Sequence, residues 1–339
     1  MKRSLLRLSI PFREPFATAS GVVAARDLLL LRLEDHDGAT GFGEAAPFEP
    51  YDGVPLERVA DALLAGAPLT DGAAPPQARA AEEMARLDLD ARRSGRPLGE
   101  PGAEAIAVNR TLPAGPPEEV AAAAREGARA GFQCFKLKVG LPDDAQRVAA
   151  VRAAIGSWPA LRVDANGAWS VAEAVERLPA MAEHDIELVE QPCATLAELT
   201  EVRRELRLPI AADESVATPE EVEAAAEAHA CDAVNVKLGA SGGYTAARET
   251  LRAASERGLE PYLSSTLDGP WGIAAALQLA ASEDVSLACG LATLELFEAR
   301  LADALARPSA GLLAVPQGPG LGVAVDDSAL AEVLVEELE

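Results

Sequence analysis

Eight short apolar segments recur along the middle of the chain, each followed by an Ala- and Glu-rich stretch with helical spacing. The segments are AIAVNRTL, CFKLKV, LRVDAN, IELVEQ, PIAADE, AVNVKL, PYLSST and LACGLA, and they lie between about Ile106 and Thr293. Strands that alternate with helices form βα units, whose strands pair in a parallel sheet. Eight such units close most economically into a (β/α)8, TIM-like barrel of the α/β class, with room for a modified last unit.

The chain of 339 residues is longer than a barrel of about 250 residues, which predicts structure outside the barrel. Residues 1–100 carry strand patterns that turn at Asp37-Gly38, followed by helix-type spacing, so we expect a separate α+β domain there. The barrel is expected to occupy residues 101–310. The Gly- and Pro-rich segment 311–339 is expected to return towards the first domain.

Composition limits the class of partner. The formal net charge of −24 argues against nucleic acid, because its phosphates would be repelled, whereas a small anionic substrate responds to the local field of its pocket. No segment has about 18 uninterrupted apolar residues and the N-terminus has no signal-peptide pattern, so we expect no membrane span and a cytoplasmic location. The four cysteines show no CxxC spacing, which predicts buried, reduced thiols. The sequence leaves a homo-oligomer open.

Charged residues stand at the C-terminal ends of five successive predicted strands. They are Lys138, Asp164, Glu190, Asp213 and Lys237, and successive positions differ by 26, 26, 23 and 24 residues, about one βα unit each. In a parallel barrel these strand ends surround one mouth, so we expect the five side chains to meet there. Lys136 precedes Lys138 by two positions and therefore points to the same face.

Three carboxylates at one barrel mouth need a counter-ion, because like-charge repulsion would otherwise protonate one of them. Ligation by oxygen alone suits a hard cation, and free positions for water or substrate point to Mg²⁺. We therefore predict that Asp164, Glu190 and Asp213 are metal ligands. Any one of these carboxylates alone is better explained as a cap of the following helix. All three in phase with two lysines favour the metal instead.

The lysines suggest the chemistry. A lysine acts as a base only when it is neutral, so its pKa must fall below the reference value of about 10.4. A nearby ammonium group or metal ion lowers it, which gives Lys136 a role in tuning Lys138, or else in contacting a substrate carboxylate. The alternative for a KxK strand is an exposed edge with solvated lysines. A base beside a divalent ion predicts removal of a proton α to a carboxylate.

The segments FKLKVG, VDANGAW, VEQP, ADES and VKLGASGG, in this order and spacing, resemble the muconate-lactonising subgroup of the enolase superfamily. The resemblance runs from the N-terminal domain, which it implies is a capping domain, through the barrel. It implies that Asp164, Glu190 and Asp213 bind Mg²⁺, that Lys138 is the base on one face of the substrate, and that Lys237 lies on the other.

Within the subgroup, VEQPCATLAELTEVRRELRLPIAADES, FATASGVVAARDLLLLRLED and LACGLATLELF resemble o-succinylbenzoate synthases, dehydrating lyases of menaquinone synthesis. The last segment lacks the Asp-x-Asp with which dipeptide epimerases hold a substrate ammonium group. The resemblance implies that Lys138 deprotonates 2-succinyl-6-hydroxy-2,4-cyclohexadiene-1-carboxylate and protonates its leaving hydroxyl in a syn elimination, while Lys237 stabilises the intermediate.

Other activities stay open at this stage. They are N-succinylamino acid racemase, dipeptide epimerase, cycloisomerase, and a metal-binding barrel without catalysis. The seventh strand is followed by Asp268-Gly269-Pro270-Trp271, where many synthases have Glu-Ser, which leaves the fine specificity open.

Weaker candidates for substrate contact are Asn109, Asn166, Ser264, Ser265, Ser20 and Tyr51. The asparagines are in phase with inward positions, and the serine hydroxyls suit a carboxylate. The loops Phe16–Ala25 and Pro47–Val54 are expected to close the mouth, with Gly21 and Gly53 as hinges. The histidines His36, His184 and His229 lie away from strand ends, and we interpret them as structural.

Overall fold

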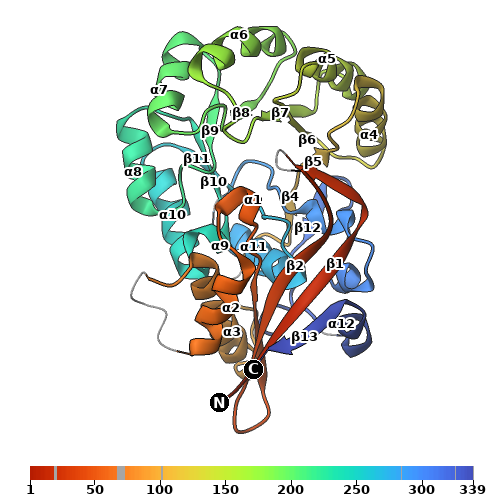
Figure 1. Ribbon diagram of the computed structural model, residues 1–339, viewed down its shortest axis with the longest axis vertical. Helices are drawn as coiled ribbons and strands as arrows, with labels where there is room; N and C mark the ends of the chain where they lie inside the picture. Colours follow the sequence, from red (N-terminus) through yellow and green to blue (C-terminus); the bar gives the residue numbers. More distant parts are fainter. Residues whose placement is uncertain (19–20, 67–72, 101, 284, 325, 339) are drawn as a thin grey trace.

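The protein is described here by a computed structural model that covers residues 1–18, 21–66, 73–100, 102–283, 285–324 and 326–338. Seven parallel strands form one curled sheet in the order β11-β10-β9-β8-β7-β6-β5 (Figure 1). They are β5 Arg110–Leu112, β6 Cys134–Lys138, β7 Ala160–Asp164, β8 Leu188–Glu190, β9 Ile210–Ala212, β10 Ala233–Val236 and β11 Glu260–Leu263. Every residue of β8, β9 and β10 is buried, as expected for parallel strands covered on both faces.

Helices follow each of these strands and surround the sheet (Figure 1). They are α4 Pro117–Arg129, α5 Asp144–Ile155, α6 Val171–Ala182, α7 Leu196–Glu205, α8 Pro219–Glu227, α9 Leu238–Ser241, α10 Tyr244–Glu256 and α11 Pro270–Ser282. The prediction of an α/β barrel built from βα units is confirmed.

The eighth position of the barrel is occupied without a regular strand. Cys289 forms a parallel bridge with Val108, and Gly290 forms one with Ser264, so this short segment joins both ends of the sheet. The prediction of a full strand over LACGLA is wrong. Glycine disfavours strands, and the chain leaves the sheet after Gly290 to form the 3-10 helix η1, Ala292–Leu296.

The predicted first barrel strand is also interrupted. It divides into β4, Ala105–Ala107, and β5, and only β5 belongs to the barrel sheet. β4 pairs antiparallel with β12, Leu312–Ala314. Backbone pairing with a segment 200 residues away is invisible to local pattern, which is why the sequence showed one continuous strand.

The N-terminal part of the chain forms a four-stranded antiparallel sheet in the order β13-β1-β2-β3. Its strands are β1 Lys2–Thr18, β2 Gly21–Glu34, β3 Thr40–Ala45 and β13 Leu334–Leu338, and its helices are α1 Glu49–Asp52, α2 Leu56–Ala65 and α3 Pro76–Arg93. A Cβ atom at Gly43 would lie 1.9 Å from the carbonyl oxygen of Ala81, so glycine there lets α3 approach β3 closely.

The C-terminal segment returns along the N-terminal sheet. After η2, Arg300–Ala304, and β12, the chain forms α12, Asp327–Val333, and then β13, which pairs with β1. Both chain ends therefore lie at one end of the molecule, and the β1–β2 hairpin extends from there towards the barrel (Figure 1). The domain limits at residues 100 and 310 stay a prediction.

The structure bears on the expectations for the cysteines and for membrane spans. All four cysteines are buried and free of disulfide bonds, as predicted. Among the described residues, no helix combines the length and the apolar character needed to cross a bilayer.

Candidate active site

A cavity of about 670 Å³ lies between the C-terminal ends of the barrel strands and the N-terminal part of the chain. The barrel contributes Lys136, Lys138, Asp213 and Lys237 to its lining. The N-terminal part contributes Phe16, Phe48, Pro50 and Tyr51, from the two segments predicted to close the mouth. α1, which contains Tyr51, lies over the barrel in Figure 1.

Strand register brings the predicted strand-end residues together. Lys138 is the Cα partner of Asp164, and Asp164 is the partner of Glu190, so three adjacent strands present them at one level. Asp213 directly follows β9, and Lys237 directly follows β10. The row therefore runs Lys138, Asp164, Glu190, Asp213, Lys237 around the mouth, with a lysine at each end.

Ammonium groups separate the carboxylates. The Nζ of Lys136 lies 2.9 Å from Asp164 Oδ2 and 2.7 Å from Glu190 Oε1. The Nζ of Lys138 lies 2.5 Å from the same Asp164 oxygen, and Lys237 pairs with the carboxylate of Asp213. Each of these three buried carboxylates thus contacts at least one ammonium group.

The pKa values of Asp164 and Lys136 follow from these contacts. Burial opposes ionisation of Asp164, but Lys136 and Lys138 outweigh it and hold the pKa of Asp164 well below its usual range. Burial also opposes the charge of Lys136, yet Asp164 and Glu190 raise the pKa of this lysine. Lys136 therefore compensates carboxylate charge in this arrangement, and its role in tuning Lys138 stays a prediction.

Two residues that the sequence analysis missed orient Glu190. Tyr262 donates its hydroxyl to Glu190 Oε2 at 3.0 Å, and Asn235 donates its amide to Oε1 at 2.9 Å. A signal for both was present, since Tyr262 stands two positions before Ser264 and Asn235 two before Lys237, which places each pair on one strand face.

The weaker candidates separate into two groups. Asn166, Ser264, Ser265 and Tyr51 all line the cavity. Asn166 accepts a hydrogen bond from Lys138 at 2.6 Å. The hydroxyl of Ser265 lies 2.8 Å from that of Thr293.

Asn109 is buried, is not among the described residues that line the cavity, and donates to the hydroxyl of Thr111 at 3.3 Å. Thr111 lines the cavity in its place. Ser20 lies outside the described residues.

Tyr51 reaches the end of the row from the N-terminal part of the chain. Its hydroxyl donates to Asp213 Oδ1 at 3.0 Å and accepts from Lys237 Nζ at 2.6 Å. The same ammonium nitrogen lies 4.3 Å from the centre of the Tyr51 ring. The sequence predicted that Tyr51 excludes water, but not that it contacts Lys237.

The departure at Asp268–Trp271 does not reach the cavity lining. Trp271 is fully buried and stacks on Phe42, with ring centres 6.2 Å apart. Gly269 donates its backbone N–H to Glu44 Oε1 at 2.6 Å. Gly269 and Trp271 therefore contact the N-terminal sheet, whereas Asp268 bears on the cavity wall indirectly, since its Oδ1 accepts from the N–H and the hydroxyl of Thr266 at 3.2 and 3.0 Å.

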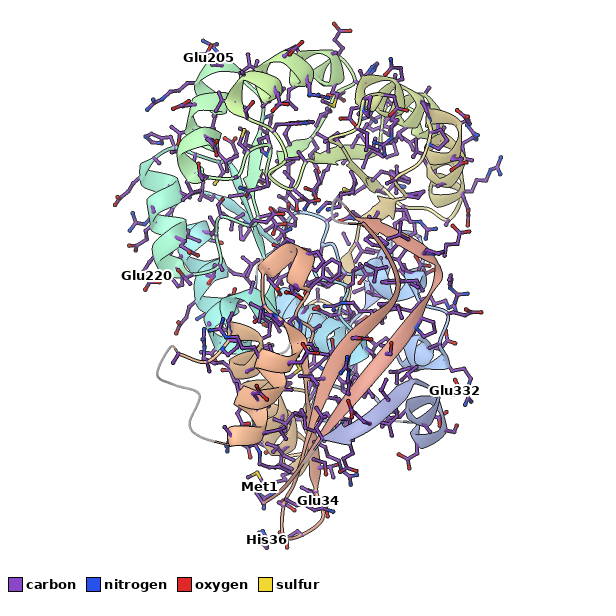
Figure 2. All side chains as sticks on the ribbon, viewed as in Figure 1. Met1, Glu34, His36, Glu205, Glu220 and Glu332 are labelled. Carbon is purple, nitrogen blue, oxygen red and sulfur yellow. The ribbon has the colours of Figure 1, made fainter. Side chains whose placement is uncertain are left out.

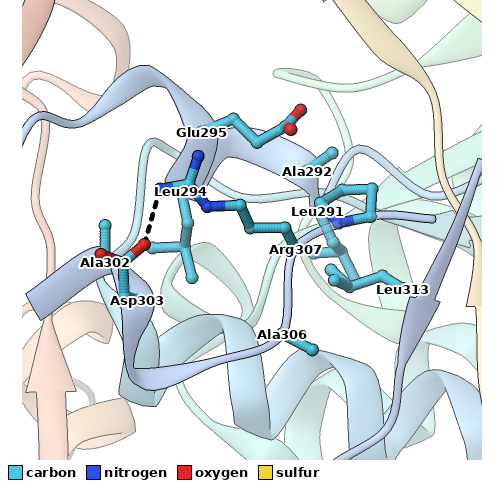
Figure 3. A pocket seen from close by; sticks show the side chains of 10 residues that line it. Leu291, Ala292, Leu294, Glu295, Ala302, Asp303, Ala306, Arg307 and Leu313 are labelled. Atoms are coloured by element: carbon cyan, nitrogen blue, oxygen red, sulfur yellow. Dashed lines mark hydrogen bonds and ion pairs between the residues drawn. The ribbon is translucent and has the colours of Figure 1, made fainter. Parts of the chain in front are cut away.

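The structure has two smaller hollows besides this cavity. One of about 240 Å³ adjoins the main cavity behind Tyr51 and Lys237. The other, of about 10 Å³, lies between η1 and η2 and has room for about one water molecule. Figure 3 shows Arg307, which lines this hollow, paired with Asp303. The ion pair has a length of 2.7 Å.

The barrel carboxylates suit a hard cation in their chemistry, since all donors are oxygen and all three side chains are buried. Among the described residues, the one group of three ligand atoms within 4.8 Å of one another is instead Asp35, His36 and Asp37. That group sits in an exposed turn far from the barrel, where Figure 2 labels His36, and Asp35 bonds the backbone of its own turn. The other two histidines, His184 and His229, follow the ends of α6 and α8.

Comparison with known proteins identifies the family. Residues 119–329 match the family model described as enolase C-terminal domain-like. The chain belongs to this family. The resemblance predicted from the five motifs, to the enolase superfamily and within it to o-succinylbenzoate synthases, is confirmed.

Two curated relatives of this chain differ from each other in activity. An o-succinylbenzoate synthase from Thermobifida fusca (strain YX) is 36% identical over 331 residues, which is 96% of this chain and 91% of the relative. An L-Ala-D/L-Glu epimerase from Bacillus subtilis (strain 168) is 33% identical over 305 residues, covering 82% of this chain and 83% of the relative.

Two solved structures match the fold. The N-succinyl Arg/Lys racemase from Bacillus cereus ATCC 14579 has a TM-score of 0.92 at 24% identity, covering 99% of this chain and 98% of that one. The dipeptide epimerase from Enterococcus faecalis V583, complexed with Mg and the dipeptide L-Leu-L-Tyr, has a TM-score of 0.87 at 27% identity, covering 96% and 99%.

Proposed function

We propose that this protein is an o-succinylbenzoate synthase-like lyase that dehydrates 2-succinyl-6-hydroxy-2,4-cyclohexadiene-1-carboxylate. The observation that carries the proposal is the row of strand-end residues, in which a lysine flanks each end of three carboxylates beside one cavity. The identity of 36% to a synthase over nearly the whole chain supports the choice of substrate.

Asp164, Glu190 and Asp213 would hold Mg²⁺, in keeping with the metal in a related epimerase structure. When bound, the ion would stabilise the negative charge that develops on the substrate carboxylate during proton removal. The remaining roles belong to the side chains of this chain. Lys136 already contacts Asp164 and Glu190, so it holds those carboxylates in place.

The reaction begins with transfer of the α-proton to the neutral amine of Lys138, which requires that the ammonium group paired with Asp164 has first released a proton to solvent. The electron pair of the broken C–H bond moves into the adjacent carboxylate as an enediolate. When this pair returns, the C–O bond to the ring hydroxyl breaks, and Lys138 gives its proton to the departing oxygen. Water leaves and the ring becomes aromatic. Lys237 faces the intermediate as a fixed positive charge and exchanges no proton.

The wall formed by residues 285–297 weighs against an aminoacyl substrate. Gly290, Thr293 and Leu296 line the cavity there, and none carries a charge. The carboxylate of Glu295 is paired with Arg110 at 2.7 Å. Glu295 is not among the described residues that line the cavity. A substrate ammonium group would therefore lack the counter-charge that the predicted epimerase alternative needs at this wall.

The test is a spectrophotometric assay of the purified protein with Mg²⁺ and the proposed substrate, following loss of the diene absorbance. We expect conversion that requires Mg²⁺, is lost in Asp164→Asn, and is retained in the matched control Glu295→Gln. No conversion by the parent protein would refute the synthase activity. Deuterium exchange from solvent into N-succinylamino acids or dipeptides would then identify a racemase or epimerase, and no exchange would leave a barrel without catalysis.

A further inference from the structure

Arg26, on β2, ties three separate backbone segments together. Its side chain is buried, and its guanidinium donates to the carbonyl oxygens of Ala46 at 2.6 Å and Pro47 at 2.7 Å. It also donates to the carbonyl oxygen of Thr266 at 3.2 Å, 240 residues away in the β11–α11 loop. The ring of Phe48 covers the guanidinium, with 4.9 Å between Cζ and the ring centre.

Both tied segments lead directly into the cavity. Ala46 and Pro47 precede Phe48 and Tyr51, which line it, and Thr266 lines it itself, in the loop after β11. The hydroxyl of Thr266 lies 3.3 Å from the Ala46 carbonyl oxygen and 3.0 Å from Asp268 Oδ1, so these two acceptors share its single proton. One buried side chain thus joins residues 46–47, which lead into the segment that covers the cavity, to the adjacent wall at Thr266.

Residues 46–51 form the segment that covers the cavity. A contact at the C-terminal end of this segment shows what the hydrogen bonds of Arg26 position. Tyr51 follows Pro47 by four residues, and its hydroxyl bonds both Lys237 and Asp213. Among the described residues, these two bonds are the direct hydrogen bonds that residues 46–51 make to the row of predicted catalytic residues. A shift of the Ala46–Pro47 backbone would be carried to Tyr51 through the single helical turn of α1.

We propose that Arg26 is a positioning residue, which holds residues 46–51 against the Ser264–Thr266 wall so that Tyr51 meets Lys237. Lysine cannot replace it, because one ammonium group cannot reach carbonyls on both sides as the planar guanidinium does. The positioning itself follows from the contacts alone. Its effect on turnover rests on the proposed function.

The first test measures amide hydrogen exchange in Arg26→Lys and in the matched control Arg32→Lys, an exposed arginine on the same strand. In the parent, the N–H groups of Tyr51 and Gly53 bond the carbonyls of Phe48 and Glu49. We expect Arg26→Lys to accelerate exchange in residues 48–53 and at Ser265 at least tenfold, with β7 and β8 unchanged. Unchanged exchange in residues 48–53 would overturn the proposal. If Arg26→Lys does not fold, Arg26→Gln takes its place in the same comparison.

The second test is a double-mutant cycle of Arg26→Lys and Tyr51→Phe on kcat/KM. Because both changes disturb the same contact with Lys237, the double variant should lose much less than the product of the two single losses. Fully multiplicative losses would show that Arg26 does not act through Tyr51. A parent protein that is inactive on the proposed substrate would refute the proposed function. The positioning role of Arg26 would still be decided by the hydrogen-exchange experiment, because that experiment needs no substrate.

Discussion

At the scale of single residues, the KxK sequence of β6 is explained by the carboxylates beside it. Lys136 and Lys138 share a strand face, and both nitrogens lie within 3 Å of Asp164. Two like charges are tolerated on this short strand because each is paired with a buried carboxylate. The sequence revealed the two lysines and the three carboxylates through their spacing. It did not reveal that Lys136 would lie between Asp164 and Glu190, because that depends on side-chain conformation.

Tyr262 provides a prediction at this scale. Its hydroxyl fixes Glu190, so Tyr262→Phe should weaken Mg²⁺ binding by roughly 10-fold, within the range usual for groups that orient a ligand. Isothermal titration of the metal-free protein with Mg²⁺ measures this. The matched control is Tyr244→Phe, a buried tyrosine on α10 whose ring contacts Arg248 of the same helix. Equal affinities of Tyr262→Phe and the parent would contradict the role assigned to Tyr262.

At the scale of elements, the helices after the three carboxylate-bearing strands all begin with the same cap. Ser170, Thr195 and Thr218 each accept from the backbone N–H three residues on, and a glutamate there reaches back to the cap. These boxes fix where each loop ends and each helix starts, next to Asp164, Glu190 and Asp213. Helix positions were therefore predictable, since S/T-x-x-E is a local signal.

Thr218→Ala should lower the free energy of unfolding by about 1 kcal/mol, because α8 loses the bond to the Glu221 N–H. Thr218→Ser, which retains a hydroxyl, should restore most of it. Thermal unfolding of the three proteins, followed by circular dichroism, gives the comparison. A Thr218→Ala protein as stable as the parent would show that the cap contributes little in this barrel.

Pairings between distant segments were beyond local pattern. The division of β4 from β5 depends on β12, and the closure of the barrel at Cys289 and Gly290 depends on Val108 and Ser264. Their partners lie far along the chain, so no window of residues contains both sides. The bond between Tyr51 and Lys237 was hidden for the same reason.

At the scale of the whole molecule, a buried acidic pair lies where the N-terminal sheet meets α11. Glu44 accepts from the N–H groups of Gly269 and Gly272, which begin that helix. Burial, and then the nearby Asp268, raise the pKa of Glu44 to about 8, against these hydrogen bonds and Arg26. The native protein therefore binds more protons than the unfolded chain between about pH 4.5 and pH 8.

Stability should consequently fall as pH rises through that window, by at most about 1.4 kcal/mol per pH unit for one proton. Glu44→Gln should show a smaller fall, because the remaining contribution comes from Asp268, whose pKa burial also raises. Calorimetric melting temperatures at pH 6, 7, 8 and 9 check this, with the exposed Glu57→Gln as the control. Equal pH dependence in the parent and Glu44→Gln would place the titration elsewhere.

In the proposed reaction, Lys138 is the base that removes the α-proton. The most direct measurement is the rate of Lys138→Ala in the diene assay, with Mg²⁺ affinity measured on the same sample. We predict a loss of turnover of at least about 10²-fold with Mg²⁺ still bound, because the three carboxylates remain. Turnover near the parent rate would remove Lys138 from the role of base and contradict the mechanism.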